Sequence, residues 1–138
     1  MNRADLQILA DIRVADAEAL IEAGRWGAAY YIAGYAVECA LKACAARRFR
    51  EYEVPEKDFV NDFYTHRFKS LAHISGCEAA LVERCVGDAE FRKSWDTLLD
   101  WTEALRYNPS LTEADARRLL AAVSDPLYGV LPWLKTLW

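Results

Sequence analysis

The length, composition and charge of the chain exclude several classes of protein. Its 138 residues suit one domain, residues 1–138, and a hydrophobic fraction of 54% is too high for a disordered chain. Only 6 glycines and 4 prolines argue against a turn-rich β protein, and a net charge of −4 is unlike the basic surface of most nucleic-acid-binding domains.

Two helices are predicted in the first third of the chain. Residues 5–22 carry apolar side chains at helical spacing, with Asp5 as the expected N-cap and Gly24 as the expected end. A second helix, roughly Gly24 to Arg50, is predicted to be buried at the centre of the fold, because from Trp26 to Ala46 nearly every residue is apolar or small. A membrane span is not expected there, because glycines, alanines and two charged residues lower its hydropathy.

A connection and a third helix are predicted in the middle of the chain. Residues 51–62 are polar and are expected to form a surface loop. A third helix is expected to begin at a Thr65 cap and to run to about Cys85. Gly76 weakens this helix and is the expected place for a break.

The second half of the chain predicts two further helices. A turn and cap at 87–88 precede apolar residues at helical spacing that continue to Leu105. Thr112 and Asp115 form an imperfect capping box, and 125–126 (Asp-Pro) is a second cap signal, so the last helix is expected to kink or restart there. In chain order, these patterns predict an all-α fold, an up-and-down bundle of about five helices.

The four cysteines favour a reducing compartment over a disulfide framework or a zinc site. None of them has C-x-x-C spacing, and only two histidines are present, so neither a metal nor another cofactor is expected. The first residues lack a signal-peptide pattern. The cytoplasm is therefore the expected location, with the cysteines as small buried side chains.

One segment strongly resembles a known family. The run from Gly24 to Ala43, GRWGAAYYIAGYAVECALKA, is similar to the second helix of HEPN domains. Later features agree with this family in order: Thr65-His66 before Leu71, then Leu105-Arg106-Tyr107, then a final helix near Trp133-Leu134-Lys135. The resemblance covers nearly the whole chain, and the helix-two run is its specific part.

The resemblance implies a HEPN-like helical bundle that usually dimerises. Many HEPN proteins are RNases, often toxins, and others act beside a small nucleotidyltransferase. Active members carry an arginine, then four to six residues, then a histidine, near the start of a late helix. Such a pair suits metal-free RNA cleavage, since histidine can move the proton of a 2′-hydroxyl and arginine can stabilise charge on the phosphate.

The chain departs from the catalytic pattern of the family. The equivalent arginine is Arg106, and no histidine follows it. Arg67 and His73 match the spacing elsewhere, within the third predicted helix. They are catalytic candidates; the alternative is that Arg67 is a solvated first-turn residue and His73 a histidine at the helix surface or the edge of the core.

Glu38 is the most unusual placement, because a carboxylate in an apolar helix needs a partner. Lys42 is the local candidate and Arg106 the distant one. We expect Glu38, Arg106 and Tyr107 to form a polar cluster inside the bundle, structural rather than catalytic.

A second set of binding candidates lies at the end of the central helix. Arg47, Arg48 and Arg50 form a basic cluster that can contact phosphate, although a solvated helix end explains it equally well.

The leading functional prediction is a degenerate or non-catalytic HEPN domain. It would act as a homodimeric interaction module that binds nucleotide or RNA, with a nucleotidyltransferase as its partner and no membrane association. The alternative is a metal-independent RNase, the toxin of a HEPN/nucleotidyltransferase toxin–antitoxin pair. A third interpretation is a plain structural dimer without a ligand.

Overall fold

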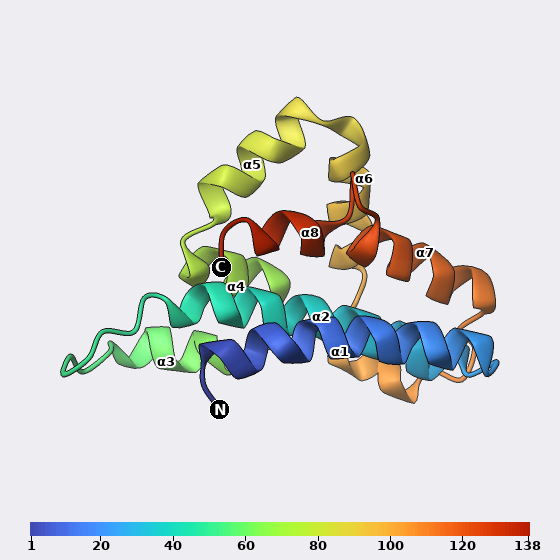
Figure 1. The fold of residues 1–138 in the computed structure, drawn as a ribbon, viewed down its shortest axis with the longest axis horizontal. Coiled ribbons are helices and arrows are strands. Elements are labelled where there is room, and N and C mark those ends of the chain that lie inside the picture. The colour runs from blue at the N-terminus through green and yellow to red at the C-terminus, as the bar shows by residue number, and fades with distance from the viewer.

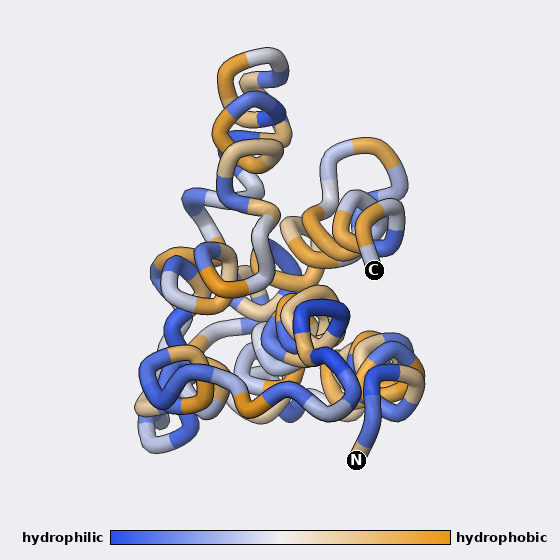
Figure 2. Tube along the Cα trace, turned by 90° about the vertical axis from the view of Figure 1, so that its left-hand side faces the viewer, coloured by the Kyte–Doolittle hydropathy of each residue, from blue (hydrophilic) through white to orange (hydrophobic).

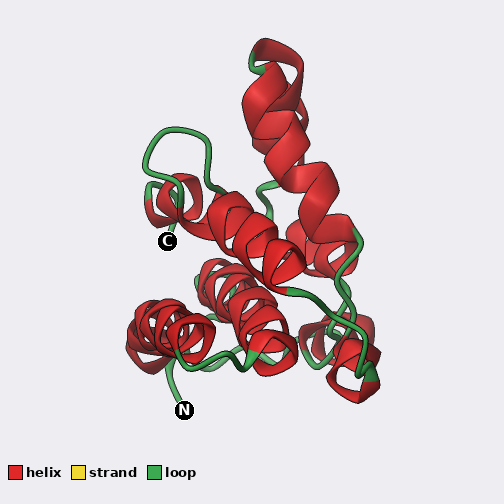
Figure 3. Ribbon diagram, turned by 90° about the vertical axis from the view of Figure 1, so that its right-hand side faces the viewer, coloured by secondary structure: helices red, strands yellow, loops and turns green.

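The computed structural model describes residues 1–138 and contains helices but no β-strand (Figure 1, Figure 3). The all-α prediction is therefore confirmed. Eight α-helices and one 3₁₀ helix follow one another as α1 (Arg3–Glu22), α2 (Trp26–Ala46), α3 (Lys57–Phe63), α4 (Phe68–Ser75), α5 (Glu78–Gly87), α6 (Ala89–Leu99), η1 (Glu103–Tyr107), α7 (Glu113–Ser124) and α8 (Val130–Lys135). None of the helices combines the length and the hydropathy that crossing a bilayer requires.

Helices α1 and α2 lie side by side along the length of the molecule (Figure 1). Asn2 caps α1: its side chain accepts the Asp5 backbone N–H while the Asp5 carboxylate accepts the Asn2 N–H. Asp5 was expected to be the cap itself and is instead the third residue of a capping box. Gly24 ends α1 with a φ of 70°, the left-handed conformation in which glycine carries no steric penalty.

Helix α2 is the centre of the core, as predicted, and at Trp26–Ala46 it is a few residues shorter than the segment from about Gly24 to Arg50 expected from the sequence. Helices α1, α4, α7 and α8 and the 3₁₀ helix η1 all pack against it. Small side chains allow this close approach from several sides. At Gly34 the backbone of α2 lies against the indole of Trp101, so closely that an added Cβ would overlap the ring. The indole Nε1–H donates to the Tyr31 carbonyl at 3.2 Å.

Two predicted elements are divided in the structure, so the expected count of about five helices is wrong. The third predicted helix breaks at Gly76 (φ 77°) into α4 and α5. The fourth ends at Leu99 rather than at Leu105, because the chain turns so that Trp101 can be buried on α2. The polar connection over 51–62 contains most of α3, whose Phe63 is buried.

The cap predictions in the second half are mostly correct. Asp88 accepts the N–H groups of residues 90 and 91 at the start of α6, and Thr112 with Asp115 forms a complete capping box at α7. Asp125 ends α7 but caps only a turn, accepting the N–H groups of residues 127 and 128. The chain then restarts as a helix at Val130.

Helices α5 and α6 form a hairpin that rises away from the α1–α2 pair, unlike an up-and-down bundle (Figure 1). Along this hairpin, apolar and polar residues alternate (Figure 2). Leu81 is the only buried residue of α5. The long helices therefore hold most of the core, and the hairpin is more exposed.

Candidate functional site

Glu38 is the only buried charged residue of the chain, with 1% of its surface exposed. Its Oε1 accepts a hydrogen bond from Lys42 Nζ at 2.7 Å, and its Oε2 lies 2.8 Å from His66 Nδ1. Both carboxylate oxygens are thus partnered, as a buried charge requires. Lys42 is confirmed as a partner, whereas the second partner is His66 and not Arg106.

The short link between α3 and α4 places His66 beside Glu38. Thr65 does not cap α4 directly; its hydroxyl accepts the backbone N–H of Arg67, which is the N-cap residue. Phe68, the first residue of α4, is buried and stacks on Trp101 with ring centroids 5.0 Å apart and planes within 3°. This stack anchors the link to the core, so that the His66 side chain, 44% exposed, stands at the surface above Glu38.

The Glu38–His66 contact orients the imidazole. An ionised carboxylate only accepts hydrogen bonds, so Nδ1 carries the proton that points at Glu38. In the neutral ring the lone pair is then on Nε2, away from the carboxylate. A histidine held in this way can accept a proton at Nε2, and in its charged form it can donate from Nε2 to an anion.

His66 lines a groove of about 330 Å³ on the surface. Its lining includes three side chains able to carry positive charge, His66, Arg67 and Lys69, and one carboxylate, that of Glu103. The other lining residues supply two hydroxyl groups and apolar contacts; they are Phe68, Ser70, Leu99, Trp101 and Thr102. The groove therefore combines positive charge with hydroxyl groups on a rigid aromatic base.

The aromatic base continues along α2 beyond the groove. Trp101 stacks on Tyr31 with ring centroids 5.9 Å apart, and Tyr31 stacks on Tyr35 at 6.4 Å. Tyr31 and Tyr35 are both half-buried residues of α2.

Arg106 and Tyr107 do not join the buried cluster at Glu38, so that part of the prediction is wrong. Both are exposed on η1, and the Arg106 guanidinium lies 4.8 Å from the centroid of the Tyr107 ring. Hydrogen bonding to Tyr107 and Tyr31 raises the pKa of Arg106. The helix that was expected to continue to Leu105 ends at Leu99. Arg106 and Tyr107 therefore lie on the separate 3₁₀ helix η1, where they are exposed to solvent instead of lying inside the bundle.

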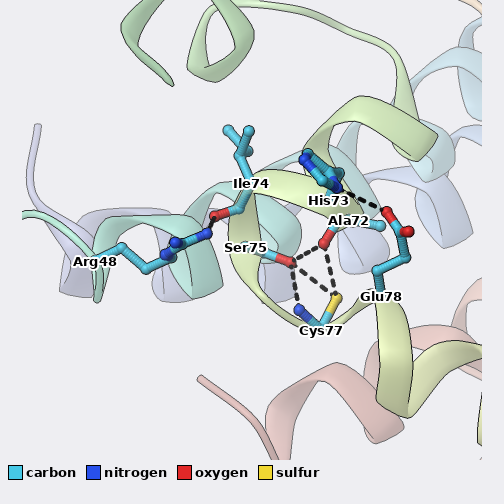
Figure 4. A network of polar contacts seen from close by, with 7 residues as sticks. All are labelled: Arg48, Ala72, His73, Ile74, Ser75, Cys77 and Glu78. Atoms are coloured by element: carbon cyan, nitrogen blue, oxygen red, sulfur yellow. Dashed lines mark hydrogen bonds and ion pairs between the residues drawn. The ribbon is translucent and has the colours of Figure 1, made fainter. Parts of the chain in front are cut away.

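The structure does not bring Arg67 and His73 together as a pair. Arg67 precedes α4 and lines the groove, whereas His73 lies in the last turn of α4, where Nδ1 is 3.0 Å from an oxygen of Glu78 (Figure 4). Residues six apart on a helix do not share a face. Arg67 is instead the direct neighbour of His66.

Arg47 and Arg48 lie at the end of α2 and contact backbone carbonyls. Arg47 Nη1 donates to Leu137, and Arg48 Nη1 donates to Ile74 at 2.9 Å. They belong to a different part of the surface, because neither lines the groove at His66.

No family model, curated protein or solved structure matches this chain. The candidate site therefore rests on its own geometry. No group of three or more His, Cys, Asp or Glu side chains is placed to hold a metal ion.

His66 is the site residue that was not predicted from the sequence. Thr65-His66 served only as support for the family resemblance. A usable signal was present: the buried Glu38 needed a second partner, and the chain has only two histidines. Which of them reaches position 38 depends on how α3 and α4 dock on α2.

Proposed function

We propose that this chain is a HEPN-like, non-catalytic module that binds nucleotide or RNA in the groove beside His66. The observation that carries the proposal is the buried Glu38, which holds His66 at the rim next to Arg67 and Lys69. Positive side chains bind phosphate, and a fixed imidazole adds a directional contact to that charge.

The remaining lining residues suit the sugar of a nucleotide. The hydroxyl groups of Ser70 and Thr102 and the carboxylate of Glu103 offer hydrogen bonds to ribose hydroxyls. Trp101 and Phe68 are buried and already stacked on each other, so they serve as a rigid base and leave no free ring face for a nucleobase. The proposal therefore rests on recognition of phosphate and sugar.

The test is fluorescence anisotropy with a labelled single-stranded RNA, with a nucleoside monophosphate as competitor. Replacing both Arg67 and Lys69 with Ala is expected to weaken RNA binding by about tenfold or more and to reduce the salt dependence by about 0.7 per lost phosphate contact. The matched control is Arg117→Ala with Arg118→Ala on α7, which removes two exposed positive charges outside the groove. Equal losses in the two variants, or no binding by the parent protein, would overturn the proposal.

A metal-independent RNase is the second candidate, and the geometry of His66 favours it. In that mechanism His66 Nε2 takes the proton of a 2′-hydroxyl and the 2′-oxygen attacks phosphorus to form a 2′,3′-cyclic phosphate, while the 5′-oxygen leaves and takes a proton from water. Arg67 stabilises the charge on the phosphate. RNA cleavage in EDTA that is lost in His66→Ala and kept in His73→Ala would establish this candidate, whereas intact RNA supports the binding module.

From the resemblance to HEPN domains we also propose two partners in the cytoplasm: a second copy of the chain and a small nucleotidyltransferase. Size-exclusion chromatography with light scattering measures the first directly. A mass equal to one chain at all concentrations would remove the homodimer from the proposal.

A further inference from the structure

A second cavity lies on another part of the surface, where the end of α2 meets the α4–α5 turn and the C-terminal residues. It has a volume of about 380 Å³, within the range of about 300–1,000 Å³ that is usual for small-molecule sites. Its eight lining residues are Cys44, Arg47, Arg48, Ser75, Gly76, Cys77, Ala80 and Leu137. None of them belongs to the groove at His66.

Two arginines, Arg47 and Arg48, line the cavity, and no aspartate or glutamate does. Arg50, three residues from Arg47, pairs with Glu53 at 3.4 Å, but neither Arg47 nor Arg48 forms an ion pair with any residue of the chain. Two neighbouring positive charges without a counter-charge repel each other, so an anion between them is stabilised by both.

Arg48 is held in place before any ligand arrives. Its Nη1 donates to the Ile74 carbonyl at 2.9 Å (Figure 4), and its guanidinium lies 5.8 Å from the centroid of the Phe59 ring. The left-handed turn at Gly76 passes beside the Arg48 stem: an added Cβ would lie 3.9 Å from Cδ. One N–H is used by the carbonyl, and a guanidinium has five, so several donors stay available.

The rest of the lining suits the organic part of a ligand. The apolar wall consists of Cys44, Cys77, Ala80 and Leu137. Burial raises the pKa of Cys44 to about 12 and also raises the pKa of Cys77, so both are neutral thiols near pH 7 and do not repel an anion. Ser75 contributes no free donor, because its hydroxyl donates to Ala72 at 2.7 Å and accepts the Cys77 N–H (Figure 4).

We propose that this cavity binds a small organic phosphate monoester, with the phosphate between Arg47 and Arg48 and the organic group against the apolar wall. This site is independent of the function proposed for the groove at His66. A phosphate monoester fits the two features together, since guanidinium groups bind phosphate with paired hydrogen bonds and the wall offers nonpolar contact.

The test uses calorimetric titration of the whole chain with phenyl phosphate, inorganic phosphate and phenol. Phenyl phosphate is expected to bind more tightly than inorganic phosphate, and phenol is expected not to bind. Arg48→Gln is expected to weaken the binding of phenyl phosphate by about tenfold. Arg50 is an exposed arginine outside the cavity, so Arg50→Gln is expected to leave the affinity unchanged.

A second pair of variants keeps both arginines and guards against effects on folding. Ala79 and Ala80 are neighbouring exposed residues of α5, and only Ala80 lines the cavity. Ala80→Glu places a carboxylate in the cavity and is expected to abolish binding, whereas Ala79→Glu adds the same charge outside it and is expected to have little effect.

The outcomes separate the two proposals. Phenyl phosphate binding that survives Arg67→Ala with Lys69→Ala but not Ala80→Glu supports the cavity at Arg47 and Arg48. Binding that instead depends on Arg67 and Lys69 places the phosphate in the groove and overturns the inference. Absence of binding at about 10 mM phenyl phosphate also overturns it, because the free energy would then be weaker than about −3 kcal/mol.

Discussion

At the residue scale, Glu38 shows how a charge can be tolerated in the core. Its side chain has 2% of its surface exposed, and the side chains of Lys42 and His66 have 12% and 44% exposed. The buried carboxylate thus contacts two side chains that are both more exposed to solvent than it is. Such a pair contributes little net stability compared with an apolar core, but removal of one partner is costly because the other stays desolvated.

The first prediction concerns this pair. Glu38→Gln removes the negative charge and leaves the Lys42 ammonium, on a side chain only 12% exposed, without a counter-charge, so the free energy of unfolding is expected to fall by about 3 kcal/mol. Urea denaturation followed by circular dichroism measures the loss. The control is Glu53→Gln, which breaks an exposed pair with Arg50 and is expected to change stability by less than about 0.5 kcal/mol. Similar losses in both variants would contradict the structural role of Glu38.

At the element scale, α2 depends on one close approach. Trp101 is 4% exposed, and its ring is sandwiched between the α2 backbone at Gly34 and the ring of Phe68. The turn after α6, the start of α4 and the middle of α2 therefore meet at one indole. Glycine is generally unfavourable inside a helix, so its presence here reflects the space that the indole needs.

The second prediction separates the packing role of Gly34 from helix propensity. Alanine favours helix by about 0.5–1 kcal/mol relative to glycine, but Gly34→Ala overlaps Trp101 and is expected to destabilise the fold by about 1–3 kcal/mol. Gly27→Ala lies in the same helix, and its Cβ would be 3.8 Å from the nearest atom outside the helix, an ordinary contact. It is expected to be neutral or stabilising in thermal denaturation. A neutral Gly34→Ala would show that Trp101 does not need this contact.

At the scale of the whole molecule, stability is unevenly distributed. Thirteen residues of α2 are buried, whereas α5 buries only Leu81 and exposes Val82 and Val86. Helices with few buried contacts open locally at a lower free-energy cost than the core.

The third prediction follows from this distribution. In native-state hydrogen exchange, amides in the middle of α5 are expected to open with free energies at least about 2 kcal/mol below those in the middle of α2. Two-dimensional NMR at constant pH measures both helices in one sample. Equal protection would mean that the α5–α6 hairpin unfolds only with the core, or that it is covered in solution by a second molecule.

Local signals in the sequence predicted a large part of the fold. The apolar pattern of α2, the break at Gly76, the Asp88 cap and the Thr112–Asp115 capping box depend on residues within a few positions of one another. The end of α6 was predicted wrongly because apolar residues continue at helical spacing after Leu99. The burial of Trp101 against α2, seventy residues away in the chain, outweighs that local pattern.

The candidate site was predicted only in part. Glu38 was identified from its own position, since a carboxylate in an apolar helix is unusual whatever the tertiary structure. Arg67 was named for its spacing to His73, yet the structure places it beside His66.

The sequence by itself determined that the chain is helical, which helix is central, and that the charge at Glu38 needs a partner. These properties follow from helix propensity, capping and hydrophobic pattern, all of which act between near neighbours. Only the tertiary structure decided that His66, 28 residues away, completes the pair, and that Arg47 and Arg48 stand in a cavity without a carboxylate. Both depend on how separate helices dock, and docking is set by side-chain packing between segments far apart in the chain.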